Sequence, residues 1–408
     1  MLDKYVLKNG MVIIGEPLPN VESAAFEFSI PAGAALLPDG SCGAANIIED
    51  WLFRGAGDYD SRQLSDALDS LGLNRSSSAG TSHISLAAAM ESENLAKALE
   101  LYASIINRPR LEDDQFIPAK KLALDQLAGL DDEPRTKVML KLREQFFPQP
   151  LGRSTAGDAD QLKSLDAQKV RQLVNNHFDL SQTIFSVAGK YDFDAVCGQM
   201  EKLFDAEKKS SASMPQITTG SCGQKYTHIH NDGAQVHIAL MTPTVTIDDV
   251  NYYNMRVAVS ILSGSMSARL FTEVREKRGL CYAIGAKYHG LKQAAGIACY
   301  AGTVPQTAQQ TLDVIIEQFD KLKEGITDEE IARAKIGLES ALIMSSESSA
   351  ARAVGIADDY YLLGRVRTLD EIKQKIEQTT KKSVTRFLTA HPFEDYTAFT
   401  IGPEKIEI

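Results

Sequence analysis

The 408-residue sequence has few cysteines, few aromatic residues and no long apolar segment. No hydrophobic run approaches the roughly 20 residues that a membrane-spanning helix needs. The five cysteines are scattered and include no C-x-x-C pair, so we expect reduced thiols rather than a disulfide framework or a zinc ribbon. The amino-terminal segment lacks a basic region followed by an apolar stretch, and we therefore expect no signal peptide and a cytoplasmic location.

The sequence also has fewer basic than acidic residues. Lys and Arg total 43 against 54 Asp and Glu, which gives a formal net charge of -11. Nucleic acids and anionic membranes both favour basic surfaces, so the charge argues against both as partners. Hydrophobic residues make up 44% and charged residues 24% of the chain, a composition typical of folded globular proteins. The length has room for about two or three domains.

The seven histidines form neither a His-x-x-Glu-His nor a His-Glu-x-x-His pair. His228 and His230 would share one face of a strand, a spacing that metal ligands can have. Two histidines at the start of a strand are more often incidental, because a zinc site needs at least three protein ligands. The histidines therefore predict no metal site.

The chain divides into two similar halves. Residues 206–224 are polar, rich in Ser, Thr and Gly, and read as a linker. In the first half a helix opening at Leu111–Asp114 carries Ala119-Lys120; in the second, a helix opening at Ile326–Glu329 carries Ala334-Lys335, 215 positions later. This fixed offset indicates a duplicated unit of about 200 residues.

Both halves begin with segments of alternating hydrophobicity, continue with an apolar helix and a shorter helix, and end in further strands and long helices. Strand hairpins followed by helices that cover one face are typical of α+β domains. We therefore predict two tandem homologous α+β domains, residues 1–205 and 225–408, each an antiparallel sheet with helices packed on one face.

Three polar residues interrupt the apolar helix of the first half. Asn46, Glu49 and Asp50 are spaced i, i+3 and i+4, so their side chains share one helix face. Polar groups on an otherwise apolar helix need a protein partner, an ion or water. The spacing alone is compatible with a helix face that borders a water-filled cleft.

The segment 43–55 resembles the one that carries His-x-x-Glu-His in the pitrilysin/insulinase metallopeptidases, the inverzincin group, which includes the mitochondrial processing peptidase and the cytochrome bc1 core proteins. The resemblance extends over essentially the whole chain. Leu7–Val12 is similar to the family's first strand, Gln149–Gly152 to its His-Pro-Leu-Gly, and Glu273–Tyr282 to its carboxyl-terminal signature.

The resemblance places the two zinc histidines on Asn46 and Asp50, the general-base glutamate on Glu49 and the third ligand on Gln126. Neutral amide oxygens bind Zn²⁺ weakly, and without the metal Glu49 has no acidified water to activate. We therefore expect degenerate positions, no metal or other cofactor in this chain, and no peptidase activity of the chain alone. A hard cation on these oxygens is the less favoured alternative.

Arg275 and Tyr282, seven positions apart, match a pair with which active members of the family grip the substrate backbone. A guanidinium offers several donors to peptide carbonyls, and a phenol adds one near a developing oxyanion. The residues alone also allow a plainer interpretation, in which Arg275 pairs with Glu273, Glu276 or another surface acid and Tyr282 is an ordinary strand aromatic. Residues 74–80 correspond to the family's substrate-binding edge strand, although their composition equally fits a loop.

The resemblance therefore implies the non-catalytic subunit of a heterodimeric zinc metallopeptidase. Its partner would be a homologous, zinc-bearing catalytic subunit, and peptides would be the substrates that both contact. Two alternatives remain open: a structural or scaffolding subunit like the bc1 core proteins, and a homodimer that binds peptides without cutting them.

Overall fold

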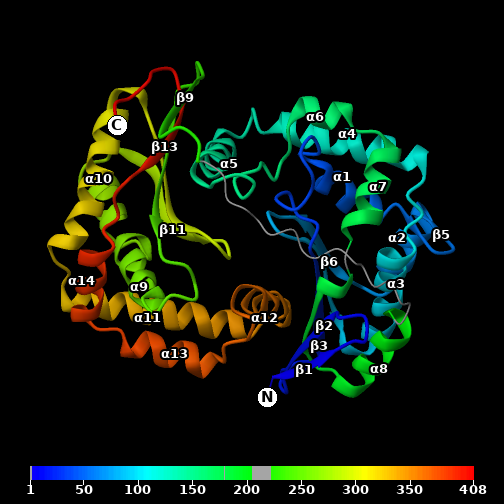
Figure 1. Cartoon of the computed structure of the whole chain (residues 1–408). Coiled ribbons are helices and arrows are strands. Elements are labelled where there is room, and N and C mark those ends of the chain that lie inside the picture. The colour runs from blue at the N-terminus through cyan, green and yellow to red at the C-terminus, as the bar shows by residue number, and fades with distance from the viewer. Residues whose placement is uncertain (1, 179, 205–221) are drawn as a thin grey trace. The chain divides into compact units, whose positions relative to one another are not determined.

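The computed structural model of the chain describes residues 2–178, 180–204 and 222–408, which pack into two compact units (Figure 1). Unit 1 comprises the described parts of Met1–Gly129, Gln149–Gly220 and Ser346–Tyr361. Unit 2 comprises those of Leu130–Pro148, Ser221–Ser345 and Leu362–Ile408. Most of the predicted linker 206–224 lies outside the described residues.

Unit 1 is a mixed sheet with helices on both faces. Its strands are β1 (Asp3–Val6), β2 (Val12–Pro17), β3 (Ser23–Ile30), β6 (Asn74–Ala79), β7 (Ile84–Glu91) and β8 (Ile184–Gly189), with the two-stranded β4 (Gly55–Ala56) and β5 (Tyr59–Asp60) beside them. Its helices are α1 (Ala44–Leu52), α2 (Ser61–Asp69), α3 (Leu95–Asn107), α4 (Asp113–Gly129), α6 (Ala159–Ser164), α7 (Ala167–His177), α8 (Phe193–Phe204) and α12 (Ser349–Leu363).

The strand order in unit 1 is β1-β2-β8-β3-β7-β6, in which β2 and β8 pair in parallel and the other neighbours are antiparallel. One face forms the hydrophobic core. Phe26 and Phe28 alternate along β3 onto this face and meet Phe185 of β8 and Tyr102 of α3, with ring centroids between 4.7 and 6.4 Å apart. The alternation in β3 therefore places its aromatic rings in the core.

The opposite face of this sheet is covered by α12, which comes from the second half of the chain. Ala353 packs against Ala25 and Ala188, whose small side chains allow the helix to approach closely. Arg352 donates to Glu16 Oε2 of β2, with 2.9 Å from Nε, and both side chains are largely buried. A helix from the second half of the chain thus completes the packing of the first unit.

Unit 2 has the same plan. Its strands are β9 (Tyr226–His230), β10 (Val236–Thr244), β11 (Cys281–Gly290), β12 (Ala295–Thr303) and β13 (Thr397–Gly402). Its helices are α5 (Pro134–Phe146), α9 (Tyr252–Ser263), α10 (Ala308–Glu324), α11 (Asp328–Ser346), α13 (Leu369–Gln378) and α14 (Lys381–Ala390), with a π-helix at Phe271–Glu276.

The strand order in unit 2 is β11-β12-β10-β13-β9, with β13 and β9 parallel. Ile238 and Leu240 of β10 point into a core formed with α9, α10 and α14. Figure 1 shows α5 on the opposite face of the sheet. There the Phe146 ring covers Gly296 of β12, and Gln145 Nε2 donates to the carbonyl of Ala398 at 3.2 Å.

The predicted α+β class and the two similar units are confirmed, but the sheets are mixed, not purely antiparallel, and helices cover both faces. The parallel pairs arise because the chain returns through helices and inserts β8 beside β2 and β13 beside β9. Packing also assigns α5 and α12 to the unit of the other half, which a boundary along the sequence does not represent. Within the described ranges, no helix has the length and apolarity needed to cross a bilayer.

Candidate functional site

Helix α1, which carries the three polar residues of the first half, begins against the segment 154–162. Its N-cap Gly43 has φ 97°, and a Cβ there would lie 2.7 Å from Leu162 Cδ2, so only glycine fits. The backbone N–H of Cys42 donates to Gln161 Oε1 at 2.9 Å. Backbone conformation and one side-chain hydrogen bond thus fix the start of the helix.

The end of α1 is held by Trp51, which is fully buried. Its indole N–H donates to the carbonyl of Glu112 at 3.1 Å, and its ring lies edge-on to Phe116 of α4 at 5.0 Å between centroids. Pairing α1 with α4 in this way brings together the two helices on which the family's zinc ligands are expected.

Asn46 and Asp50 both have protein partners. Asn46 Nδ2 donates to the carbonyl of Thr155 at 2.8 Å. Asp50 Oδ2 lies 2.5 Å from Nε of Arg54, which follows the end of α1, and both side chains are about three-quarters buried. The carboxylate of Asp50 is thus already neutralised by a guanidinium.

Glu49 lies between these two residues on α1 and reaches towards the sheet. The Ser77 hydroxyl of the edge strand β6 donates a hydrogen bond to Glu49 Oε1. Burial raises the pKa of Glu49, the Ser77 hydrogen bond opposes that rise, and the negative charge of Asp50 adds to it. Residues 74–79 therefore form a strand rather than a loop, and this edge strand touches the retained glutamate.

Gln126 lies on an exposed position of α4, the helix that packs against α1. Of the four positions at which the family's zinc ligands and general base are expected, two carry amides and two carry carboxylates. One of these carboxylates, that of Asp50, is ion-paired. Among the residues that the structure describes, no group of three or more His, Cys, Asp or Glu side chains is placed to hold a metal ion.

Arg275 lies on a π-helix whose end is set by glycine. Gly279 has φ 61°, and the next residue donates its N–H back to the carbonyl of Val274 at 3.0 Å, as expected for a helix that ends at a left-handed glycine. The Arg275 guanidinium is exposed and lies 4.9 Å from the centroid of the Phe271 ring.

Glu273, two residues before Arg275, is used by other cations. Glu273 pairs with Lys277 Nζ at 2.6 Å and with Arg278 Nη1 at 2.7 Å. These hydrogen bonds lower the pKa of Glu273. The interpretation in which Arg275 serves only as the partner of Glu273 is therefore wrong, and its guanidinium has no carboxylate partner among the described residues.

Tyr282 stands at the beginning of the sheet's edge strand β11. The register with β12 shifts between Cys281 and Ala283, and this bulge leaves Tyr282 43% exposed. Its ring lies over Gly302 of β12, where a Cβ would come within 3.0 Å of Tyr282 Cε2. Burial of the ring and the nearby Cys281 raise the pKa of its phenol, which therefore stays protonated as a donor at neutral pH.

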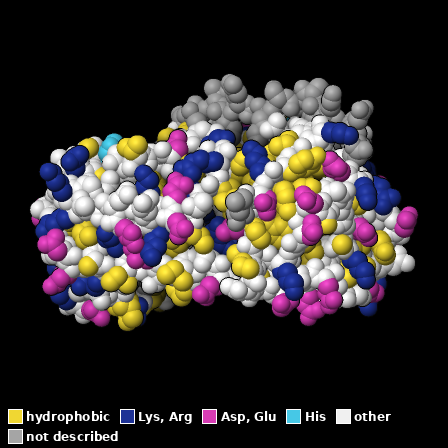
Figure 2. Space-filling model, turned by 90° about the horizontal axis from the view of Figure 1, so that it is seen from below, with side chains coloured by type: hydrophobic (Ala, Val, Ile, Leu, Met, Phe, Trp, Pro, Cys, Tyr) yellow, Lys and Arg dark blue, Asp and Glu magenta, His cyan; other side chains and the backbone are white. Residues whose placement is uncertain are grey.

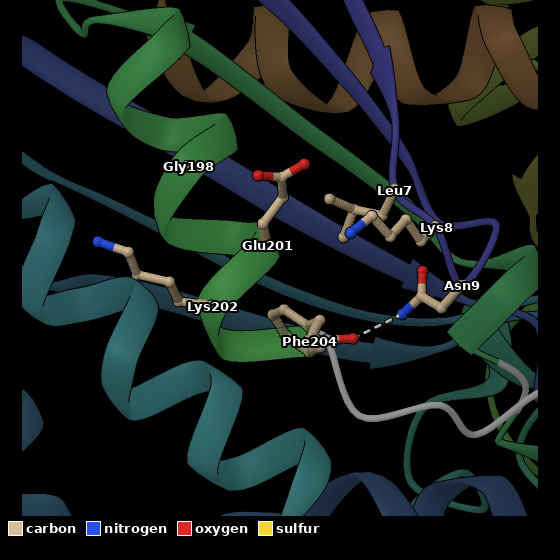
Figure 3. Close-up of a pocket in the computed structure, with 7 residues that line it drawn as sticks. All are labelled: Leu7, Lys8, Asn9, Gly198, Glu201, Lys202 and Phe204. Carbon is tan, nitrogen blue, oxygen red and sulfur yellow. Dashed lines mark hydrogen bonds between the residues drawn. The ribbon is translucent and has the colours of Figure 1, made fainter.

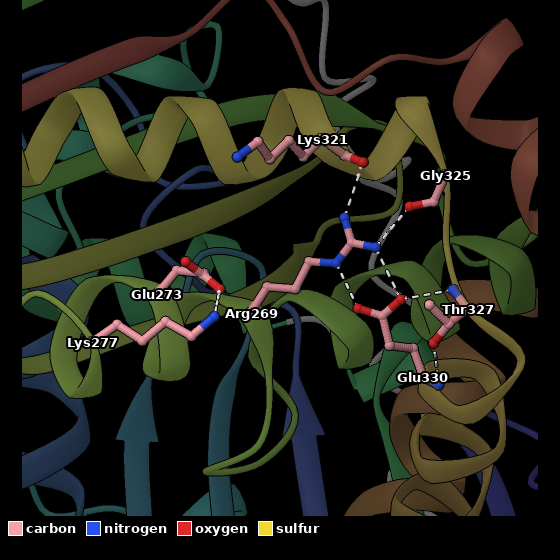
Figure 4. Close-up of polar contacts among 7 residues, drawn as sticks. All are labelled: Arg269, Glu273, Lys277, Lys321, Gly325, Thr327 and Glu330. Carbon is pink, nitrogen blue, oxygen red and sulfur yellow. Dashed lines mark hydrogen bonds and ion pairs between the residues drawn. The ribbon is translucent and has the colours of Figure 1, made fainter.

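A largely buried ion pair, with each side chain 15% exposed, anchors the segment that carries Arg275. Arg269 donates to both carboxylate oxygens of Glu330, at 2.7 and 2.9 Å, and also to the carbonyls of Lys321 and Gly325 (Figure 4). The Glu330 carboxylate in turn accepts the Thr327 N–H at 2.8 Å. The guanidinium therefore joins this segment to the α10–α11 connection.

Comparison with known proteins identifies the relationship. A model of the insulinase family, peptidase family M16, matches residues 12–159, and one described as the peptidase M16 inactive domain matches residues 164–338. The chain belongs to the M16 family.

Curated M16 relatives match along nearly their full length. An uncharacterized zinc protease of Rickettsia felis is 26% identical over 91% of this chain and 90% of its own. Another, from Bacillus subtilis, is 25% identical over 99% of this chain and 98% of its own.

Solved structures share the M16 fold at lower identity. A peptidase M16 inactive domain from Pseudomonas fluorescens aligns with a TM-score of 0.88 and 17% identity, over 100% of this chain and 99% of that one. A protease from Helicobacter pylori aligns with a TM-score of 0.89 and 20% identity, over 99% of both chains.

His228 and His230, whose spacing could have suited metal ligands, bond to other groups of the described chain. His228 Nδ1 lies 2.8 Å from Thr400 Oγ1, and His230 bonds Asp232 and the carbonyl of Pro403. A pocket of about 300 Å³ lies between the β1–β2 turn and α8, where Asn9 donates to the carbonyl of Phe204 (Figure 3). On the face drawn in Figure 2, acidic and basic side chains are interspersed and no patch of one charge dominates.

The sequence did not reveal the partners that define these sites. Arg54 follows Asp50 by four positions, so its ion pair could have been read from helix periodicity. Ser77 and Thr155 reach α1 only through the tertiary fold, and no local pattern connects them with Glu49 or Asn46.

Proposed function

We propose that this M16 chain is the non-catalytic subunit of a heterodimeric zinc metallopeptidase. It binds peptide for a homologous partner that carries the zinc ion and has no peptidase activity alone. Arg275 and Tyr282 contact the substrate backbone, while Asn46, Glu49, Asp50 and Gln126 hold no metal.

The donor set supports the first part of this proposal. A catalytic zinc ion needs three protein ligands drawn from imidazole, thiolate or carboxylate. Asn46 and Gln126 supply amides, and the amide of Asn46 is oriented by its bond to Thr155. Zinc would have to compete with the Arg54 guanidinium for Asp50. These residues do not fit the ion that the family implies.

The exposed donors of unit 2 support the second part. Arg275 has no carboxylate partner among the described residues, and Tyr282 is exposed on a bulge with no described hydrogen bond to its hydroxyl. A structural subunit gains no stability from two exposed, unpaired donors. Asn46 and Asp50 are bonded to other protein groups, whereas Arg275 and Tyr282 are exposed without such partners in the described part of the chain. This contrast carries the proposal.

Metal analysis tests the first part. The purified chain is dialysed against excess Zn²⁺, passed over a desalting column and analysed for zinc by mass spectrometry, with an M16 peptidase that retains His-x-x-Glu-His as the positive control. We expect less than about one-tenth of an equivalent, because neutral amides bind zinc weakly. Stoichiometric zinc, or chelator-sensitive cleavage of peptides by the chain alone, would contradict this proposal.

Reconstitution tests the second part. The chain is mixed with a similar-length M16 chain from the same organism that retains the zinc motif, and cleavage of an unstructured fluorogenic peptide is followed. We expect activity well above that of either chain alone. Arg275→Ala should reduce it by about 10- to 100-fold, because a guanidinium that holds the substrate backbone contributes charge-assisted hydrogen bonds.

Arg333→Ala, which removes an exposed arginine from α11, is the matched control and should change little. Full activity with Arg275→Ala, or no gain on mixing, would overturn the proposal.

A further inference from the structure

A second group of polar side chains lies on the face of the unit 2 sheet that α5 covers. His237 of β10 and Tyr300 of β12 are each 7% exposed, and His237 Nδ1 lies 2.9 Å from the Tyr300 hydroxyl. Arg135 of α5 places its guanidinium carbon 4.9 Å from the centroid of the Tyr300 ring. A cation over the face of an aromatic ring is attracted by its quadrupole, so this contact holds Arg135 in place.

This group continues into the proposed substrate-binding residues. The absence of a side chain at Gly302 creates the connection, because a Cβ there would lie 2.9 Å from the Tyr300 hydroxyl and 3.0 Å from Tyr282 Cε2. The two tyrosines therefore converge above Gly302, one buried and one exposed. The Arg135 guanidinium lies over the ring of Tyr300, which shares the space above Gly302 with Tyr282.

The acids close to Arg135 in sequence are engaged elsewhere or face solvent. Asp131 Oδ1 pairs with Lys137 Nζ at 2.5 Å, and Glu133 Oε2 accepts the Thr136 hydroxyl at 3.0 Å. Asp132 is exposed. Burial lowers the pKa of His237, so at neutral pH that ring contributes no charge.

The exposed guanidinium groups in this part of unit 2, those of Arg135 and Arg275, therefore have no carboxylate partners among the described residues. Tyr282 is exposed and shares the space above Gly302 with Tyr300, the ring on which Arg135 lies. The chain is acidic overall, but charges more than about 10 Å away are largely screened at physiological ionic strength. The unpaired guanidinium groups therefore favour a ligand that carries a negative charge.

We propose that Arg135 forms an anion subsite that recognises a carboxylate of the bound peptide. The inference rests on the proposed function and adds a substrate preference to it. The guanidinium stacked on Tyr300 keeps its N–H edge available for a two-pronged hydrogen bond, the geometry that carboxylates accept. The carboxylate is supplied either by an acidic side chain or by the peptide's carboxyl terminus, which share this chemistry.

Binding of three fluorescein-labelled peptides to the full-length chain, followed by fluorescence anisotropy, tests the proposal. The peptides share one unstructured sequence: one has a central Glu and an amidated end, one a central Gln and an amidated end, and one a central Gln and a free carboxyl end. We expect one or both carboxylate peptides to bind about fivefold more tightly than the neutral peptide, because a charge-assisted pair at a partly exposed site contributes modestly. Which of the two does so identifies the source of the carboxylate.

Arg135→Gln should bring all three affinities within about twofold and leave that of the neutral peptide unchanged, since it removes only a charge-assisted contact. Arg333→Gln removes the same charge from α11 and should keep the preference. Equal affinities for the wild-type chain, or a preference that survives Arg135→Gln, would overturn the subsite. If affinities are equal and Arg275→Ala weakens all three, the subsite is wrong and the proposed function stands. If no peptide binds, both are wrong.

Discussion

Arg269 and Glu330 meet through two parallel hydrogen bonds, 2.7 and 2.9 Å long, and each side chain is only 15% exposed. The same guanidinium donates to the carbonyls of Lys321 and Gly325, so one side chain holds the segment between α10 and α11 in place. Six residues after Arg269 comes Arg275. The position of the proposed substrate-binding arginine therefore depends on an ion pair that does not itself touch substrate.

Removing one partner of this pair should destabilise the chain. Arg269→Met leaves Glu330 without its counter-charge and should lower the free energy of unfolding by about 2–3 kcal/mol. Urea unfolding followed by circular dichroism measures the loss. The double variant Arg269→Met with Glu330→Met leaves no unpaired charge and should recover part of it. A single variant as stable as the wild type would contradict the structural role of the pair.

The same pair predicts a loss of stability in acid. Burial opposes the charge of Glu330, but hydrogen bonds from Arg269 and from the Thr327 backbone outweigh it and hold the pKa of Glu330 below its ordinary value. The folded state thus binds the proton more weakly than the unfolded state. The stability is present above the unfolded pKa near 4.5 and is lost as pH falls through the lower folded value. Glu330→Gln should show a shallower decline below pH 5 than the wild type.

His289 predicts a second, less acidic transition. Burial in unit 2 and the positive charge of Arg143 on α5 lower its pKa from 6.5 to about 4. Because the unfolded chain binds this proton more readily, stability falls as pH drops from 6.5 towards 4, by about 2–3 kcal/mol in total. Unfolding free energies measured at intervals of pH should show this slope, and His289→Gln should remove it. Lys287→Gln on the same strand is the control and should keep it.

Trp51 should be the most sensitive position of α1. It is fully buried and bonds the carbonyl of Glu112 that precedes α4. Trp51→Ala should lower the unfolding free energy by about 3–5 kcal/mol through the cavity it leaves. Ile117→Ala on α4 removes a side chain that is 69% exposed and should change stability by less than about 0.5 kcal/mol. Equal effects of the two would contradict the packing of α1 on α4.

Two glycine-to-alanine changes should have opposite effects on the free energy of unfolding. At Gly302 the new methyl group meets the Tyr300 hydroxyl and the Tyr282 ring, and should cost about 1–2 kcal/mol while weakening peptide binding. At Gly337, inside α11, a Cβ meets nothing within 4 Å, and alanine should stabilise the chain by about 0.5–1 kcal/mol. Thermal unfolding and peptide titration of both variants measure these effects.

Local patterns predicted the elements of the fold more successfully than their pairing. The segments of alternating hydrophobicity that begin the two halves include β3 (Ser23–Ile30) and β9 (Tyr226–His230), because such alternation depends only on adjacent residues. Glycine is the residue type that most often ends a helix in the left-handed conformation, and Gly279 does so here. The insertion of β8 between β2 and β3 brings together segments more than 150 residues apart, which no short window of sequence records.

The site was predictable to a similar extent. Spacing alone placed Asn46, Glu49 and Asp50 on one face of α1, and the structure agrees. The partners of Glu49 and Arg135 could not be found in this way. Ser77 and Tyr300 reach them only after a strand and a helix have packed, and a stacked guanidinium leaves no signature in the order of residues.

The reciprocal placement of α5 and α12 has a consequence for biosynthesis. When the ribosome has completed β8, every strand of the first sheet exists, yet the helix that must lie on Ala25 and Ala188 is still more than 150 codons away. A nascent chain at that stage presents an uncovered layer of backbone and small apolar side chains. Final folding of the first sheet must therefore wait for the second half to be translated, and separately expressed halves would each lack a cover that only the other contains.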